Sequence, residues 1–397
     1  MLTRKEIILL ATFGAIAPLA IDMYLPAMPA LAANLGISAR LAGQSVSVFL
    51  IGIAAGQLVT GPLSDRLGRR PMILSGLALF TLASLVAAMA TAFPVLLAAR
   101  LFQALGACAV MVSGRAVVRD RLDARESARL FSLLALIGGM APVLAPMIGA
   151  GIIQFGEWRL IFLVMAAFSL LTLLFAFPVL TESRSAATAA NARFEHPFRS
   201  YVALLRNRQL LGYLATAACN SAAFFTYVAN SATVLIDGYG MTPRAFSILF
   251  ATNSVGLVCA NQINRRLLRT RMPAQVLRLS ARNALVFASA LLLFAATGAG
   301  GLPVLVGLLF LVVASIAPVQ ANTMAGGLGV DPLRSGSTAA LFGATTFTAG
   351  AIASWIAGLA YRGDGGGLAV VVAFCLTGSA LATFRLVARE PDPQPAE

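Results

Sequence analysis

The chain has 397 residues, of which 59% are hydrophobic and only 11% are charged, and its mean hydropathy is +0.86. Soluble domains carry about 25% charged residues, so this composition excludes a protein whose whole surface faces water. The net charge of +14 would suit a nucleic-acid-binding protein, but the arginines form short clusters between long apolar stretches. That distribution is typical of membrane topology, and we expect no nucleic-acid partner.

The apolar stretches have the length of helices that cross a bilayer, which takes about 20 residues. They predict an all-α integral membrane protein with twelve transmembrane helices. In chain order the expected spans are 7–29, 43–63, 72–93, 95–118, 129–153, 160–180, 209–235, 245–264, 280–298, 302–328, 336–360 and 367–387. An even number of spans places both termini on the same side of the membrane.

The distribution of cationic residues predicts which side this is. Lysine and arginine crowd the N terminus and every second loop, whereas the opposite loops contain only Arg40, Arg159, Arg244 and Arg362. Cytoplasmic loops carry the excess of positive charge in membrane proteins. We therefore expect a multi-pass protein with both termini in the cytoplasm.

The longest polar segment, 182–208, divides six expected spans from six. It predicts an N-terminal bundle over 1–181, a cytoplasmic linker over 182–208 and a C-terminal bundle over 209–397; His196, the only histidine, lies in the linker, where we expect it to be solvated. Segments 56–69 and 256–269 align at glycine, aliphatic and arginine positions. The split and the repeat together predict two pseudo-symmetric six-helix bundles, which enclose a site near the bilayer midplane and alternately expose it.

Few charges lie inside the expected spans: Asp22 in the first, and Arg100 and Arg115 in the fourth. Each such charge costs at least about 2.5–3.5 kcal/mol and requires a partner or a water-filled cavity. At 1.5 Å per residue, Asp22 lies roughly 23 Å from the cytoplasmic edge and Arg100 roughly 8 Å from the outer edge, so their depths nearly coincide in a core about 30 Å thick.

We therefore hypothesise that Asp22 is the proton-coupling carboxylate and that Arg100 is its electrostatic partner. Two structural alternatives remain open at this point. The two residues can form a fixed ion pair, or Asp22 can cap a helix break in the proline-rich stretch from Pro18 to Pro29.

The loop between the second and third spans reads GPLSDRLGRRP, with Gly61, Asp65, Arg66, Gly68, Arg69 and Arg70. This stretch resembles motif A of the major facilitator superfamily. The resemblance implies an inner gate held by charge, in which Asp65 faces the start of the eleventh helix and a basic residue of the fourth, here Arg115 or Arg119. The alternative is a basic loop that serves topology alone. The second-half copy has Arg265 in place of Asp65, so we expect an asymmetric gate.

Three further stretches resemble the twelve-span drug:proton antiporters, in particular the Bcr/CflA group of bacterial exporters. Segment 21–29 (IDMYLPAMP) resembles the first-helix motif of that group, and segment 100–106 (RLFQALG) resembles motif B, whose arginine is associated with proton coupling. Pro142 and the segment APMIGA, with Pro146 and Gly149, resemble the antiporter motif C, with alanine at two of its glycine positions. The resemblance implies a bacterial inner-membrane protein.

Polar and aromatic residues that face between the bundles are the candidates for substrate contact. They are Tyr24, Gln57, Gln103, Met111, Asn220, Phe224, Tyr227, Asn253, Gln320 and Asn322. A cavity with aromatic and methionine walls and few charges suits amphiphilic or neutral compounds. Each amide can instead link neighbouring helices, and each aromatic residue can face lipid.

The leading hypothesis is a proton-coupled antiporter that exports small amphiphilic or neutral compounds, for example chloramphenicol- or bicyclomycin-like antibiotics, by alternating access. The alternative is an amino-acid or sugar transporter of the same fold. A membrane-embedded enzyme would need a polar catalytic group within the spans, and a channel or scaffold would need neither a coupling acid nor a gate. The four cysteines lie in separate apolar segments, so we expect no disulfide and no metal. We expect a monomer that needs no cofactor besides the proton gradient.

Overall fold

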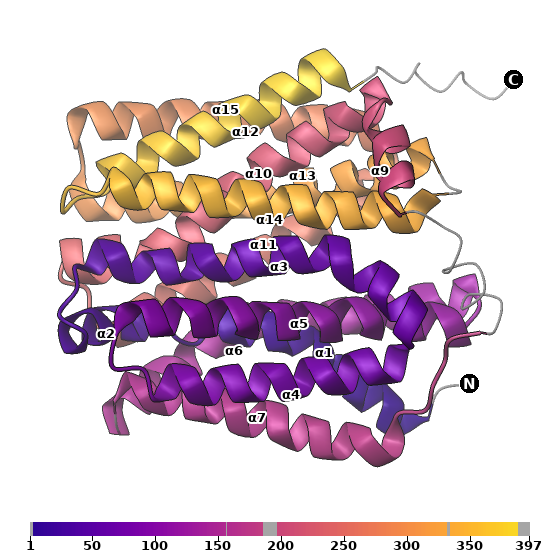
Figure 1. Cartoon of the computed structure of the whole chain (residues 1–397). Coiled ribbons are helices and arrows are strands. Elements are labelled where there is room, and N and C mark those ends of the chain that lie inside the picture. Colours follow the sequence, from indigo (N-terminus) through magenta and orange to yellow (C-terminus); the bar gives the residue numbers. More distant parts are fainter. Residues whose placement is uncertain (1–2, 156, 186–196, 332–333, 388–397) are drawn as a thin grey trace, which may run out of the picture.

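The computed structural model describes residues 3–155, 157–185, 197–331 and 334–387. The protein is all-α, as predicted, and twelve long helices lie side by side in it (Figure 1). They are α1 (Arg4–Asp22), α3 (Ala39–Leu67), α4 (Arg69–Ala88), α5 (Phe93–Arg121), α6 (Ala124–Phe155), α7 (Trp158–Val179), α10 (Arg208–Ala232), α11 (Pro243–Leu267), α12 (Pro273–Thr297), α13 (Gly301–Val330), α14 (Ser335–Leu359) and α15 (Gly366–Leu386). Each expected span overlaps one of them.

Among the described residues, ten helices are long and apolar enough to cross a membrane, which makes this a multi-pass membrane protein. In α6 the described apolar segment is Met140–Phe155. Helix α10 is less uniformly apolar and carries buried Asn220, Thr226 and Asn230. Polar residues of this kind belong in a span that faces other helices or a cavity rather than lipid.

The helices form two six-helix bundles, α1–α7 and α10–α15, as the repeat predicted. Within the first bundle α4 packs between α5 and α7, and within the second α10 packs against α14 and α15. Across the boundary α3 lies along α14 and α6 along α11 (Figure 1). A small residue permits the close approach of α3 and α14: a Cβ atom added at Gly343 would lie 2.7 Å from the amide carbon of Gln57.

Helix α1 begins and α15 ends at the same end of the molecule, which we call the terminal end (Figure 1). At the opposite end hydrogen bonds join the two bundles. The Thr233 hydroxyl, in the π-helix η2 (Thr233–Gly238), donates to the Ala39 carbonyl at 3.5 Å. The Ser247 hydroxyl donates to the Pro146 carbonyl at 3.0 Å. The bundles are therefore closed against each other at the opposite end, beyond the site described below.

Proline breaks the first span in its middle. Helix α1 ends at Asp22 and is followed by the 3-10 helix η1 (Leu25–Ala27) and the short helix α2 (Met28–Asn34). Pro26 and Pro29 lie in the first turns of these two short helices, because a residue without an N–H is tolerated there and breaks a helix elsewhere. The break places Asp22 at a helix C terminus inside the protein.

Candidate functional site

A cavity of about 640 Å³ lies between the bundles and contains Asp22. The first bundle contributes Asp22 and Pro142, and the second contributes the remaining lining residues from α10, α11 and α13, among them Phe224, Tyr227 and Asn253. Its walls extend along α11 to Arg265, near the terminal end. We call this space the Asp22 cavity. Its volume lies in the range of small-molecule pockets, about 300–1,000 Å³.

Asp22 is 6% exposed. Among the described residues, no side chain forms an ion pair with it or donates a hydrogen bond to it. The helix-cap alternative is not observed, because Asp22 ends α1 and caps no following helix. Its carboxylate thus faces the cavity with no compensating charge, which makes the cost of ionising it high.

An aromatic wall stands opposite Asp22. The rings of Tyr227 and Phe250 stack with their centroids 5.6 Å apart, and the Asn253 amide donates a hydrogen bond of 2.6 Å to the Tyr227 hydroxyl. Phe224, Tyr227 and Asn253, three of the candidates for substrate contact, line this cavity together with Phe250. Stacked rings with one anchored hydroxyl offer apolar area and a single polar handle, which suits an amphiphilic guest.

Arg100 lies beside this site but does not pair with Asp22. Its side chain is fully buried, and Nη1 donates to the Ala20 carbonyl at 2.9 Å and to Gln103 Oε1 at 2.6 Å. The guanidinium packs over the rings of Tyr24, Phe49 and Phe162 at 4.8, 4.4 and 5.9 Å. The fixed ion pair is therefore absent from the described residues, and Arg100 contacts the backbone of α1 two residues before Asp22.

Several predicted substrate contacts serve other roles in the structure. Tyr24 and Gln103 are buried around Arg100: the Tyr24 hydroxyl is hydrogen-bonded to Ser45, and the Gln103 amide donates to Ser84 at 2.8 Å. Both side chains are satisfied inside the first bundle and do not line the Asp22 cavity.

The amides Asn220, Gln320 and Asn322 link helices of the second bundle instead of lining the Asp22 cavity. Asn220 donates to the Ile316 carbonyl at 3.1 Å, Gln320 accepts from Ser221 at 3.1 Å, and Asn322 donates to Asn264 at 2.7 Å. Buried amides need such partners in a medium without water. Gln57 and Met111 line two other cavities.

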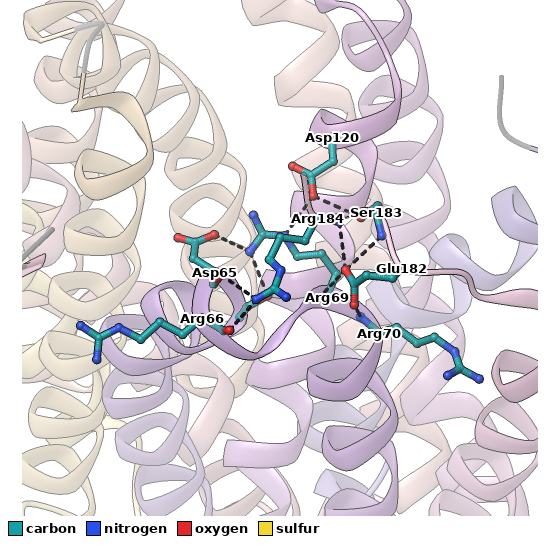
Figure 2. Close-up of polar contacts among 9 residues, drawn as sticks. Asp65, Arg66, Arg69, Arg70, Asp120, Glu182, Ser183 and Arg184 are labelled. Atoms are coloured by element: carbon teal, nitrogen blue, oxygen red, sulfur yellow. Dashed lines mark hydrogen bonds and ion pairs between the residues drawn. The ribbon is translucent and has the colours of Figure 1, made fainter. Parts of the chain in front are cut away.

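The motif A residues form a charged network at the terminal end of the first bundle (Figure 2). Arg69 is 5% exposed and pairs with Asp65, while its Nε donates to Asp120 at 3.0 Å. The Asp65 partner is therefore Arg69 rather than the expected Arg115 or Arg119. The reason is geometric, because Asp65 and Arg69 lie one turn apart across the bend between α3 and α4. Arg184 donates to the carbonyls of Asp65 and Arg66.

A second cavity, of about 520 Å³, opens beside this network. Four arginines (Arg66, Arg69, Arg115, Arg119) and one acid, Asp65, line it. Gln57, Gly61 and residues at the start of α14 complete its wall. We call it the basic cavity. The start of the eleventh span thus lines the same cavity as Asp65, as the family resemblance implied. The described charged residues that line this cavity carry a net positive charge.

Glu182, just after α7, caps the first turn of α4. Its carboxylate accepts hydrogen bonds from the backbone N–H of Arg69 at 2.9 Å, Arg70 at 3.2 Å, Ser183 at 3.0 Å and Arg184 at 2.9 Å. Gly68 makes this approach possible: its φ is +111°, and an added Cβ would lie 3.1 Å from the Glu182 carboxyl carbon. A carboxylate at a helix N terminus satisfies otherwise unpaired donors and the helix dipole.

Replacing Glu182 by glutamine should destabilise the protein by about 1 kcal/mol at pH 7. Burial raises the pKa of the Glu182 carboxyl, but the four backbone donors outweigh it and hold the pKa below the ordinary value of 4.5. A lowered folded-state pKa gives stability that is present above the unfolded value and is lost as the pH falls through the folded value. The wild-type advantage in detergent unfolding should therefore shrink as the pH falls below 4.5 and vanish below the lowered folded-state pKa.

The matched control for Glu182→Gln is Glu157→Gln, because the Glu157 side chain is 70% exposed in an ion pair with Arg159. Exposed pairs contribute little to stability, so this variant should unfold like the wild type. A Glu182→Gln deficit that stays constant down to pH 3 would assign the effect to packing rather than to charge.

The motif C residues bring α6 close to the break in α1. Pro142 lines the Asp22 cavity, and the Pro146 carbonyl accepts the hydrogen bond from Ser247 of the other bundle. Gly149 contacts the backbone of Met23: an added Cβ would overlap its carbonyl oxygen and lie 2.8 Å from its carbonyl carbon. Gly149 therefore fixes how near α6 approaches the residue after Asp22.

The two bundles differ at their terminal ends. Arg265, Arg266 and Arg269 occupy the positions that align with Asp65, Arg66 and Arg69, and they line a shared cavity with Gln262. In the described part of the second bundle these arginines form no ion pair, and Arg265 donates to Gln262 at 3.3 Å. The charged network is thus confined to the first bundle, as the degraded second copy predicted.

Sequence reasoning missed three elements of the site. Glu182 and Asp120 complete the motif A network, and Phe250 completes the aromatic wall. Glu182 was recognisable as the first acid after the sixth span, at the level of a cationic loop. Nothing in the sequence distinguishes Phe250 from the many phenylalanines that face lipid.

Comparison with known proteins agrees with this geometry. The sequence profile of the Major Facilitator Superfamily matches residues 10–358. An uncharacterized MFS-type transporter, YdgK, of Bacillus subtilis (strain 168) is 34% identical over 353 residues, 88% of each chain. A bicyclomycin resistance protein homolog of Haemophilus influenzae is 28% identical over 97% of this chain and 98% of its own.

Among solved structures, a D-xylose–proton symporter superposes with a TM-score of 0.74 at 16% identity, over 96% of this chain and 98% of that one. At that identity the match shows the fold alone. With the family profile and the motif geometry it leaves no ambiguity about class: the chain is a transporter of the Major Facilitator Superfamily and resembles its Bcr/CflA group.

Proposed function

We propose that this protein is a proton-coupled antiporter that exports small amphiphilic or neutral compounds. The observation that carries the proposal is Asp22, a buried carboxylate that lines the cavity between the bundles and has no hydrogen-bond or ion-pair partner among the described residues. A lone ionisable group at membrane depth is a functional site by default. The resistance name of the Haemophilus influenzae relative supports an antibiotic-like substrate.

The apolar and aromatic lining favours amphiphilic compounds over the alternative of a sugar or amino acid. Phe224, Tyr227 and Phe250 form one side of the Asp22 cavity, and Asp22 is the one acid among its described lining residues. Sugars need many hydrogen-bonding groups, and amino acids need a charge of each sign. In the proposed cycle substrate and proton compete for this cavity, so that binding of one releases the other.

The difference between the two ends of the molecule supports alternating access as part of the proposal. The bundles are joined at the opposite end by the Thr233 and Ser247 hydrogen bonds, and the cavities lie toward the terminal end. We propose that the terminal end faces the cytoplasm of a bacterium, that the protein lies in the inner membrane, and that it works as a monomer. Substrate then enters from the cytoplasm and leaves when the closed end opens.

Purified protein in proteoliposomes tests the proposal. With an imposed proton gradient, bicyclomycin or chloramphenicol should move against the direction of proton flow, and collapse of the gradient with a protonophore should stop the movement. Addition of either compound to detergent-solubilised protein should release protons into a weakly buffered solution. Accumulation of the compound along the proton gradient would refute antiport.

A further inference from the structure

Arg115 is a cation in the transmembrane region that has no ion-pair or hydrogen-bond partner among the described residues. It lies in α5, four residues before Arg119, and its side chain is exposed to internal cavities. In the described part of the chain no carboxylate or carbonyl binds its guanidinium. A charge at membrane depth requires a partner or a water-filled cavity, and Arg115 lines two cavities.

Two different cavities meet at Arg115. One is the basic cavity, and the other is a separate space of about 320 Å³ between α1, α5 and α6. Leu10, Phe13, Met111 and Phe131 line this second space, and Arg115 is the one charged residue among its described lining residues. We call it the apolar cavity. Its volume is at the lower end of the range for ligand pockets.

The nearby acids are already engaged. Asp65 and Asp120 both bind Arg69, and the Glu182 carboxylate accepts hydrogen bonds from backbone N–H groups. Neutralising Arg115 from within would therefore require breaking this network. An external anion would meet an unpaired guanidinium, and a guanidinium binds carboxylate or phosphate through two parallel hydrogen bonds.

We propose that Arg115 and the apolar cavity form a binding site for acidic amphiphiles. The anionic head group binds the Arg115 guanidinium at the border of the two cavities, and the hydrocarbon chain lies against Leu10, Phe13, Met111 and Phe131. The site is distinct from the Asp22 cavity, which shares no lining residue with it. This proposal rests on the proposed function in one respect: it adds acidic amphiphiles to the compounds that the protein exports.

Binding of radiolabelled decanoate to the protein in phosphatidylcholine nanodiscs tests the site, with empty nanodiscs subtracted. Decanol and decylammonium, with the same chain, serve as neutral and cationic probes. Decanoate should bind at least about tenfold more tightly than either. Arg115→Gln should weaken decanoate binding about tenfold and leave decanol binding nearly unchanged, and Arg115→Lys should retain part of the affinity.

Two further variants separate the head-group contact from the cavity. Arg119→Gln is the matched charge control, because Arg119 lines the basic cavity but not the apolar one. It should weaken decanoate binding much less than Arg115→Gln does. Gly14→Phe fills the apolar cavity from a position where an added Cβ meets nothing within 4 Å, so it should fold normally and weaken decanoate and decanol alike.

Undiminished decanoate binding in Arg115→Gln, or an equal loss in Arg119→Gln, would overturn the proposal. Because binding is measured without a proton gradient, failed antiport leaves this result intact, and the reverse also holds. Nanodiscs that contain phosphatidylglycerol identify the source of the anion. Competition with decanoate would assign the site to a lipid phosphate, and unchanged binding would assign it to soluble acidic amphiphiles.

Discussion

Replacing Asp22 by asparagine should abolish proton-driven transport while the substrate still binds. Asparagine has the same shape but cannot take up or release a proton, and the carboxylate makes no ion pair among the described residues that the change would break. The transport rate should fall at least about tenfold, and proton release on addition of bicyclomycin or chloramphenicol should disappear. Stopped-flow transport into proteoliposomes and proton release from solubilised protein measure the two effects.

The control for Asp22→Asn is again Glu157→Gln, which makes the same carboxylate-to-amide change at an exposed site. It should leave both measurements unchanged. Substrate affinity of Asp22→Asn should remain within about threefold of the wild type, which separates lost coupling from lost folding. If Asp22→Asn kept full gradient-driven transport, Asp22 would be a structural residue and the coupling acid would lie elsewhere.

The fold was predictable from composition and spacing, because a bilayer imposes its thickness on every helix. Each of the twelve apolar stretches forms a long helix in the structure. The repeat of segment 56–69 at 256–269 corresponds to the two bundles. Helix ends were less accurate: α5 continues to Arg121, beyond the predicted end at 118. Cationic residues continue a helix into the head-group region, where hydropathy no longer marks its end.

The site was predictable where a family motif or an intramembrane charge marked it, as for Asp22 and Arg69. The site was not predictable where a buried polar side chain has more than one possible partner at the same depth. Depth alone suggested that Arg100 and Asp22 meet, yet Arg100 binds the Ala20 carbonyl and Gln103. Helix rotation decides which face a residue presents, and a sequence does not record it. The same limit explains Asn322, whose buried partner is Asn264.

Replacing Gly149 by alanine should damage both stability and transport. The added methyl group would overlap the Met23 carbonyl oxygen, and backbone atoms of α1 and α6 cannot rotate away as a side chain does. Helix α6 must shift, which strains the break next to Asp22 and the Ser247–Pro146 contact between the bundles. Overpacking of this kind costs about 1–3 kcal/mol. Thermal unfolding in detergent and proton-driven transport should both show the loss, with transport reduced at least about tenfold.

Gly151→Ala is the matched control for Gly149→Ala. Gly151 lies two residues further along α6, and an added Cβ there meets nothing within 4 Å. Alanine has the higher helix propensity by about 1 kcal/mol, so Gly151→Ala should be neutral or slightly stabilising and fully active. Equal behaviour of the two variants would mean that α6 does not approach Met23 closely in the working protein. A loss confined to Gly149→Ala would instead show that the motif C glycine fixes the position of Asp22.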